Sequence, residues 1–112
     1  MGLKPLPAQT VFHSGRTLNL VPLGQGFDAL LLSSKGEVVE HGWKTNRFAA
    51  VELVLKKQLD CLKRQKTYRH EKYQRKIVRD LRELLMDCCG SYAKKSHTVR
   101  RAFKLLAQPL VR

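Results

Sequence analysis

The residues with the clearest chemical potential are the cations of a single segment, residues 63–79. The segment reads Lys-Arg-Gln-Lys-Thr-Tyr-Arg-His-Glu-Lys-Tyr-Gln-Arg-Lys-Ile-Val-Arg. Proteins bind nucleic acids chiefly through fixed cations that neutralise phosphates and release counterions, and tyrosines among such cations can stack on unpaired bases. Residues 56–82 hold eleven basic and three acidic residues, so pairing within a helix leaves most of this charge uncompensated. The segment predicts a nucleic-acid contact, with an acidic protein partner or a plain solvated helix face as alternatives.

A second basic cluster lies at residues 94–101, which read Lys-Lys-Ser-His-Thr-Val-Arg-Arg. Helix N-termini and Ser/Thr hydroxyls both favour phosphate, so this stretch predicts a second RNA contact, and the alternative is a capping loop with solvated lysines. The predicted RNA-binding residues are Lys63, Arg64, Lys66, Tyr68, Arg69, Lys72, Tyr73, Arg75, Lys76, Arg79, Arg82, Lys94, Lys95, Arg100 and Arg101.

The remaining reactive residue types form no pattern that indicates catalysis or metal binding. The three cysteines are Cys61, Cys88 and Cys89, without a Cys-x-x-Cys pair. An odd number of cysteines, two of them adjacent, is typical of a reducing compartment. Gly24-x-Gly26 lacks the further residues of a nucleotide-binding loop. We therefore expect a protein that is not an enzyme, with no metal, no cofactor and no small-molecule substrate.

The basic segments are expected to lie on helices. Apolar residues recur at helical spacing in two stretches separated by the charged segment: Phe48, Val51, Leu55, Leu59 and Leu62, then Ile77, Leu81, Leu84, Leu85 and Cys88. Because neither Pro nor Gly interrupts residues 48–89, we predict one long basic helix over about 46–89, capped at Thr45 or Asn46 and ending at Gly90. A break near 63–70 is the alternative. The charged segment is expected to prevent the two stretches from forming one compact core.

The ends of the chain give weaker signals. A short C-terminal helix should follow Ser96 or Thr98 and end at Pro109, with Val99, Phe103, Leu106 and Leu110 on one face. Residues 1–16 are expected to form an extended arm, and residues 17–21 a short strand. Residues 27–33 and 37–41 flank Ser-Lys-Gly and suggest a small β-hairpin, with a helix over 28–33 as the alternative. The predicted fold is mainly α: a single small domain with an arm over 1–44 and a helical RNA-binding region over 45–112.

Composition limits the function classes. The chain has 112 residues with 22 Lys and Arg against nine Asp and Glu, a net charge of +13, which calls for an anionic partner. Its longest apolar run is far shorter than the roughly 18–20 residues that span a bilayer, so no transmembrane segment is expected. The first acidic residue is Asp28, and an acid-free N-terminal stretch is compatible with organelle import.

Part of the basic segment resembles a known family. Leu59-x-x-Leu62-Lys63-Arg64-x-Lys66-x-Tyr68, continuing to Arg75-Lys76, is similar to the basic helix of the bacterial and organellar small-subunit ribosomal protein twenty-one family. Phe27-Asp28, with Val21 six residues earlier, is similar to the pair and strand that precede that helix. The resemblance covers about 25 residues; the family's Pro after the Tyr is absent, the spacing between Phe27 and Leu59 is longer, and residues 83–112 have no counterpart.

The resemblance implies a structural component of a mitochondrial ribosome, located in the matrix, whose partners are ribosomal RNA and neighbouring ribosomal proteins. Two alternatives stay open. One is an accessory subunit or assembly factor of a respiratory complex, because Tyr68-Arg69 faintly resembles the Leu-Tyr-Arg proteins although the Leu is missing. The other is a basic DNA-binding factor, which would bind duplex DNA in a sequence-specific way.

Overall fold

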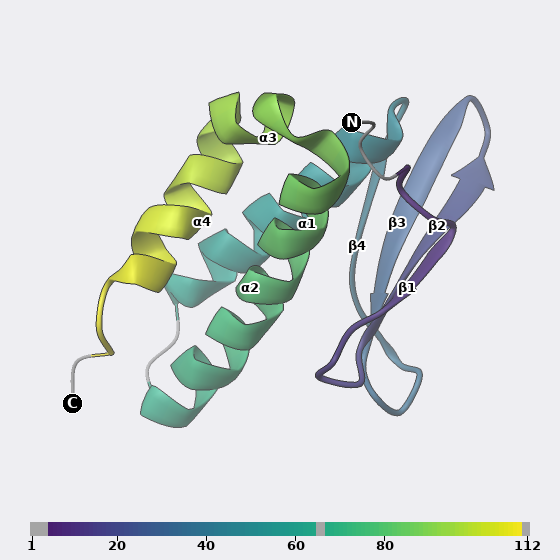
Figure 1. The fold of residues 1–112 in the computed structure, drawn as a ribbon. Coiled ribbons are helices and arrows are strands. Elements are labelled where there is room, and N and C mark those ends of the chain that lie inside the picture. The colour runs from purple at the N-terminus through teal and green to yellow at the C-terminus, as the bar shows by residue number, and fades with distance from the viewer. Residues whose placement is uncertain (1–4, 65–66, 111–112) are drawn as a thin grey trace.

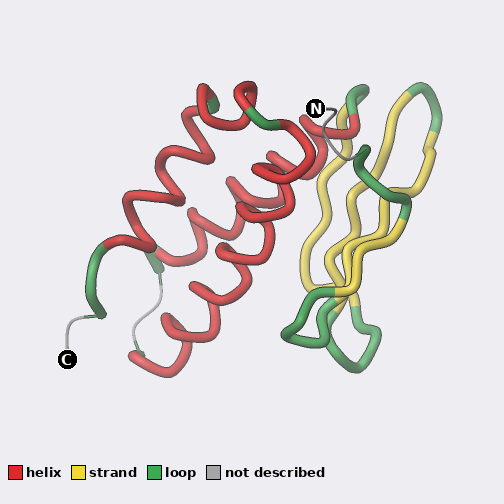
Figure 2. Tube along the Cα trace, viewed as in Figure 1, coloured by secondary structure: helices red, strands yellow, loops and turns green. Residues whose placement is uncertain are grey.

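The chain folds into a four-stranded antiparallel sheet followed by four helices (Figures 1 and 2). The computed structural model describes residues 5–64 and 67–110. The strands are β1 (Gln9–Val11), β2 (Thr17–Leu23), β3 (Gly26–Leu32) and β4 (Val38–Lys44); the helices are α1 (Arg47–Leu62), α2 (Tyr68–Cys89), α3 (Ser91–Lys95) and α4 (His97–Ala107). The prediction of a mainly α fold is therefore wrong: this is an α/β fold.

The sheet is a meander in the order β1-β2-β3-β4, so the expected hairpin is one part of a larger unit. β3 and β4 pair, with Leu30 opposite His41, and the alternative helix over 28–33 is wrong. Their connection closes as expected: Ser33 N–H donates to the carbonyl of Glu37, and Gly36 takes a φ of +86°. The expected extended arm contains β1, which pairs with β2.

The predicted long helix is two helices, which corresponds to the alternative of a break near 63–70. α1 ends at Leu62, and α2 begins after Thr67, whose Oγ1 accepts the amide of His70 at 3.3 Å. The segment between them has no large apolar side chain before Tyr68. A continuous helix would hold two apolar stripes apart along roughly 60 Å, whereas a turn lets α2 pack against α1 and buries both stripes.

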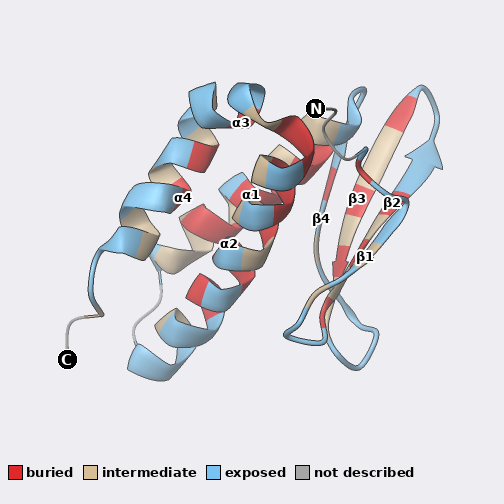
Figure 3. Cartoon of the chain, in the orientation of Figure 1, coloured by how far each residue is buried: buried red, intermediate tan, exposed pale blue. Residues whose placement is uncertain are grey.

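One hydrophobic core joins the sheet to the helices, so the expectation that the two stripes could not share a core is also wrong. Leu18 and Leu31 of the sheet, Val54 of α1, and Val78 and Leu81 of α2 are each at most 1% exposed. In Figure 3 the buried residues lie where α1, α2 and the sheet face one another. The radius of gyration, 13.6 Å, is close to the roughly 13 Å of a compact domain of this size.

The N-terminal residues are built into this core rather than extending from it. Leu6 is buried, and Arg16 is buried with its guanidinium 3.8 Å from the carboxylate of Asp80 in α2. Ser14 also donates its hydroxyl to Asp80, at 2.7 Å. The acid-free stretch that suggested organelle import thus supplies part of the fold, and mitochondrial location stays a prediction.

Local signals set the start of α1, the end of α2 and the start of α4 as predicted. Asn46 caps α1 by accepting the amides of Phe48 and Ala49, and Gly90 ends α2 with a φ of +54°. Ser96 caps α4, and the five-residue helix α3 was not predicted. α4 lies on the side of α1 and α2 that faces away from the sheet (Figure 1). Within the described residues, every helix is too short or too polar to cross a membrane.

Candidate nucleic-acid interface

The outward face of α2 carries a row of exposed cations, which we call the α2 basic stripe. It consists of Arg69, Lys72, Lys76 and Arg79. Residues three and four apart share one side of a helix, and α2 packs its opposite side, including Ile77 and Leu81, into the core. The burial of the apolar residues therefore fixes the direction in which the cations point.

Most of the acidic residues have partners elsewhere in the fold and do not pair with the α2 basic stripe. Five of the nine acidic residues have partners outside the stripe: Asp28 with His41, Glu40 with Lys57, Glu52 with Ser96, Asp60 with Arg101 and Asp80 with Arg16. Among the described residues, no ion pair involves a member of the α2 basic stripe. The stripe therefore carries no ion pair in the described structure, and Glu83 and Asp87, exposed one and two turns beyond Arg79 on α2, mark where it ends.

Further predicted cations border the stripe at both ends of the helical layer. Lys63 and Arg64 are exposed where α1 ends, close in the chain to the start of α2. Lys94 and Lys95 of α3 and Arg100 of α4 are exposed as well. The predicted contact at Lys66 lies outside the described residues. Tyr68, the first residue of α2, is 40% exposed and thus available to a ligand.

Arg75 differs from the other predicted contacts because its side chain points inward. It is 9% exposed, and its Nη2 donates to the carbonyls of Leu106 at 3.2 Å and Gln108 at 2.5 Å. These carbonyls stand at the C-terminal end of α4, where helices leave acceptors without partners and favour a cation. Arg75 therefore joins α2 to α4, and its guanidinium is not free to bind a phosphate.

Three more predicted contacts are engaged within the chain. Arg101 forms an ion pair with Asp60 at 3.2 Å, which links α4 to α1. The guanidinium of Arg16 lies 4.4 Å from the centre of the Tyr73 ring, so one face of this tyrosine is occupied. The guanidinium of Arg82 lies 5.0 Å from the ring centre of Phe103 on α4.

Phe103 lies on the surface, although helical spacing predicts it on the apolar face of the last helix. Its side chain is 57% exposed, while Val99 and Ala102 of the same helix are buried. The neighbouring cations Arg100, Arg101 and Lys104 are the sequence feature that could have indicated this exposure, because an aromatic residue flanked by cations suits a surface at least as well as a core.

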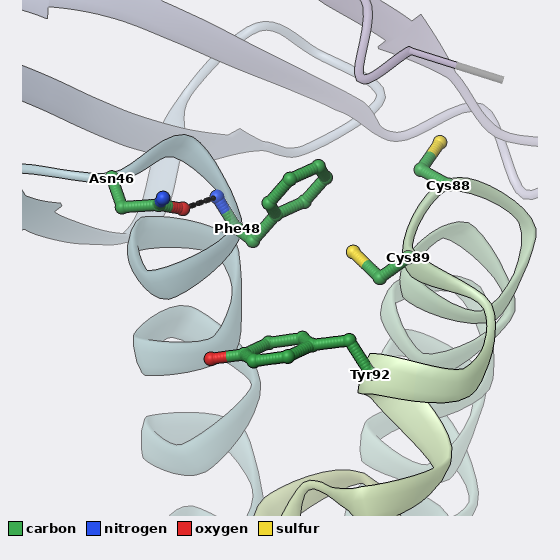
Figure 4. Close-up of a pocket in the computed structure, with 5 residues that line it drawn as sticks. All are labelled: Asn46, Phe48, Cys88, Cys89 and Tyr92. Atoms are coloured by element: carbon green, nitrogen blue, oxygen red, sulfur yellow. Dashed lines mark hydrogen bonds between the residues drawn. The ribbon is translucent and has the colours of Figure 1, made fainter. Parts of the chain in front are cut away.

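A hollow of about 350 Å³ lies elsewhere, between the start of α1 and the end of α2. The rings of Phe48 and Tyr92 face the same space as Cys89 (Figure 4). Burial, together with the adjacent Cys88 and Glu52, raises the pKa of the Cys89 thiol to about 12. Since the thiolate is the nucleophile, this raised pKa disfavours reaction of Cys89 near neutral pH. The described residues contain no group of three His, Cys, Asp or Glu side chains placed to hold a metal ion.

The described surface thus offers one feature with a clear chemical use: exposed, uncompensated cations on α2, α3 and α4, with aromatic rings beside them. Comparisons of the chain with protein-family models, with curated proteins and with solved structures give no match.

Proposed function

We propose that this protein binds RNA as a structural component of a ribonucleoprotein particle. The observation that carries the proposal is the α2 basic stripe: four exposed cations on one helix face, without an acidic partner in the described structure. Phosphates spaced along a nucleic-acid backbone provide the repeated anions that such a row requires, and each neutralised phosphate releases counterions.

Two properties of the surface favour RNA over an acidic protein. Further exposed cations, Lys63 and Arg64, stand six and five residues before Arg69 in the chain, and a long polyanion can bind more cations than the stripe alone supplies. Exposed aromatic rings accompany the cations at Tyr68 and Phe103, and RNA offers unpaired bases that stack on such rings. An acidic peptide has carboxylates for the cations but offers a ring to Tyr68 or Phe103 only where an aromatic residue happens to stand, whereas every nucleotide carries a base.

The particle we propose is a ribosome, and specifically a mitochondrial one, on the basis of the sequence resemblance. The segment that carries this resemblance, Leu59 to Lys76, spans the break between α1 and α2. Its cations therefore come from the end of one helix and the start of another. The proposal of RNA binding depends only on their exposure and charge, whereas the ribosomal assignment depends on the resemblance.

We place the protein neighbours at the face of the sheet that points away from the helices (Figure 1). Val21 and Leu23 of β2 and Trp43 of β4 are each at least 40% exposed. Trp43 is held in place because its indole N–H donates to the carbonyl of Leu23 at 2.9 Å. Residues 1–55 carry five basic and four acidic residues, so this half of the chain is nearly neutral and suits an apolar protein contact better than a phosphate backbone.

Binding of labelled RNA measured at several salt concentrations tests the proposal. Affinity should fall steeply with salt. The triple variant Arg69→Gln/Lys72→Gln/Lys76→Gln should bind every RNA sequence more weakly, and its slope of log affinity against log salt should be shallower by about 2, since single strands lose about 0.7 per phosphate contact. The variant Lys35→Gln/Lys44→Gln/Lys56→Gln removes the same charge from exposed positions outside the stripe and serves as the matched control.

Two results would reject RNA binding by the stripe: an affinity that does not depend on salt, or an equal loss in the stripe variant and its control. The absorbance ratio and mass spectrum of the native particle then separate the assignments. A particle with ribosomal proteins and RNA supports the ribosome, and one with respiratory subunits and no RNA supports the accessory-subunit alternative. Tight binding to one duplex DNA sequence would instead identify a DNA-binding factor.

A further inference from the structure

A groove between α2 and the α3–α4 segment combines cations with apolar groups. Its volume is about 250 Å³, and it is lined by Arg82, Met86, Lys94, Val99, Arg100 and Phe103. No acidic residue lines it. Three cations from three different helices thus converge on a floor made of a methionine, a valine and a phenylalanine. The groove lies on the same helix as the α2 basic stripe, three residues along the chain from Arg79.

Phe103 contributes little to the core of the protein. More than half of its surface is exposed, and its contact with the guanidinium of Arg82, at 5.0 Å, covers only part of the ring. An arginine stacked on an aromatic ring forms a planar platform, and both groups stack readily on nucleobases. This arrangement is suited to holding a flat ligand next to positive charge.

Arg82 also has an unused donor at this place. Its Nε is buried and has no hydrogen-bond partner among the described residues. A buried donor without an acceptor is unfavourable, so a rotation of the Arg82 side chain that brought Nε to a ligand oxygen would be favourable. The side chain is therefore better satisfied with an anionic or carbonyl-bearing ligand present than without one.

We propose that this groove binds one unpaired nucleotide of the RNA, with the base stacked against Phe103 and Arg82 and the phosphate held by Lys94 and Arg100. The inference rests on the proposed function and names the kind of RNA that is bound: single-stranded or locally unpaired. A volume of about 250 Å³ is below the roughly 300–1,000 Å³ of pockets for drug-sized ligands, which agrees with a single base. A continuous duplex keeps its bases stacked inside the helix and has none to place in the groove.

The test uses the full chain with a short labelled single-stranded RNA and a blunt RNA duplex of the same length. Phe103→Ala should weaken single-strand binding about 5- to 150-fold, because stacking on one aromatic ring is worth about 1–3 kcal/mol per base, and should change duplex binding by less than about twofold. Phe103→Trp keeps a stacking surface and should restore single-strand binding. Tyr92→Ala removes another exposed aromatic residue, 63% exposed and outside the groove, and should have no effect.

Each other outcome overturns the inference. Equal losses for the single strand and the duplex would show that Phe103 acts through structure or charge placement, and no loss in either would show that no base stacks there. If Phe103→Ala weakened binding of polyglutamate while RNA binding was unchanged, the groove would be a site for acidic peptide. The proposed function fails by a different result, namely wild-type protein that binds neither RNA in a salt-dependent way.

Discussion

Arg75 and Lys76 are adjacent in the sequence and both basic, yet the structure predicts opposite consequences for their replacement. Lys76 belongs to the exposed α2 basic stripe. Arg75 is buried and donates to two carbonyls, of Leu106 and Gln108, at the end of α4. Arg75→Gln should therefore lower stability, whereas Lys76→Gln should lower RNA affinity and leave stability nearly unchanged.

The size of the Arg75 effect follows from its contacts. A hydrogen bond from a charged donor contributes about 1.5–3 kcal/mol, and these two bonds are partly buried, so water replaces them incompletely when they are lost. The shorter Gln side chain does not reach both carbonyls, so both bonds are at risk. We expect Arg75→Gln to lower the free energy of unfolding by about 2–4 kcal/mol. For a domain of this size that is a fall in Tm of roughly 8–16 °C.

Urea unfolding followed by circular dichroism measures the stability of both variants, and RNA binding is then measured at a temperature at which both are folded. Under these conditions Arg75→Gln should retain nearly full affinity, and Lys76→Gln should show reduced affinity and a shallower salt dependence. The opposite result would be an Arg75→Gln variant that is as stable as the wild type and loses RNA affinity to the same extent as Lys76→Gln. That result would show that Arg75 faces the ligand and not α4.

Three further predictions concern the core, the buried ion pair and the thiol. Leu81→Ala, at a position with 0% exposure, should cost about 2–5 kcal/mol in urea unfolding, while the RNA affinity of the folded fraction stays the same. Asp80→Asn leaves the buried guanidinium of Arg16 without its counter-ion at 3.8 Å and should cost about 3 kcal/mol; the exposed Asp87→Asn on the same helix is the control and should cost almost nothing. The pKa of Cys89 is raised from 9.0 to about 12 by burial and by the nearby Cys88 and Glu52, so the thiol stabilises the fold fully below pH 9 and this contribution is lost between pH 9 and 12. Cys89→Ala should accordingly lose stability less steeply over that range, and parallel curves for the two proteins would contradict the assignment.

The sequence predicted the buried sides of the helices and several of their ends because these signals are local, although it favoured one long helix where the structure has α1 and α2. Apolar residues three and four apart marked the buried sides of α1 and α2, and Asn46, Gly90 and Ser96 marked helix ends through contacts within a few residues. The break between α1 and α2 remained an alternative because neither Gly nor Pro stands there. What selects the break is the shared core, and that gain comes from residues far apart in the sequence, such as Leu55 and Leu81.

The sheet was underestimated for a different reason. In β3, Ala29 and Leu31 face the core, but Leu30 and Leu32 on the other face are apolar too, so the strand lacks the alternation that identifies a half-buried strand. β1 has three residues and exists through its pairing with β2, which no local pattern reveals. A meander of such strands is recognisable only once their partners are known.

In the candidate site, too, local features could be predicted and contacts between distant residues could not. Composition was enough to predict the exposed cations of α2, because a basic residue on an amphipathic helix faces solvent by default. Arg75 and Arg82 were the exceptions, since the acceptors of Arg75 lie 31 and 33 residues away in the chain and the guanidinium of Arg82 lies on the ring of Phe103. Phe103 was misplaced because helical spacing assigns it to an apolar face, whereas the residues that α4 buries are Val99 and Ala102.

The distribution of charge over the fold suggests how one small protein could contact two kinds of partner. Eleven of the 22 basic residues lie in residues 56–82, on and around the helical layer, while the strands belong to the nearly neutral first half. The α2 basic stripe and the open sheet face therefore differ in the ligand that they favour, phosphate on one and apolar surface on the other. RNA bound to the stripe would also lower the mutual repulsion of its cations, which costs most at low salt. If the proposed function holds, the protein would gain stability from bound RNA and would keep its open sheet face for a protein neighbour.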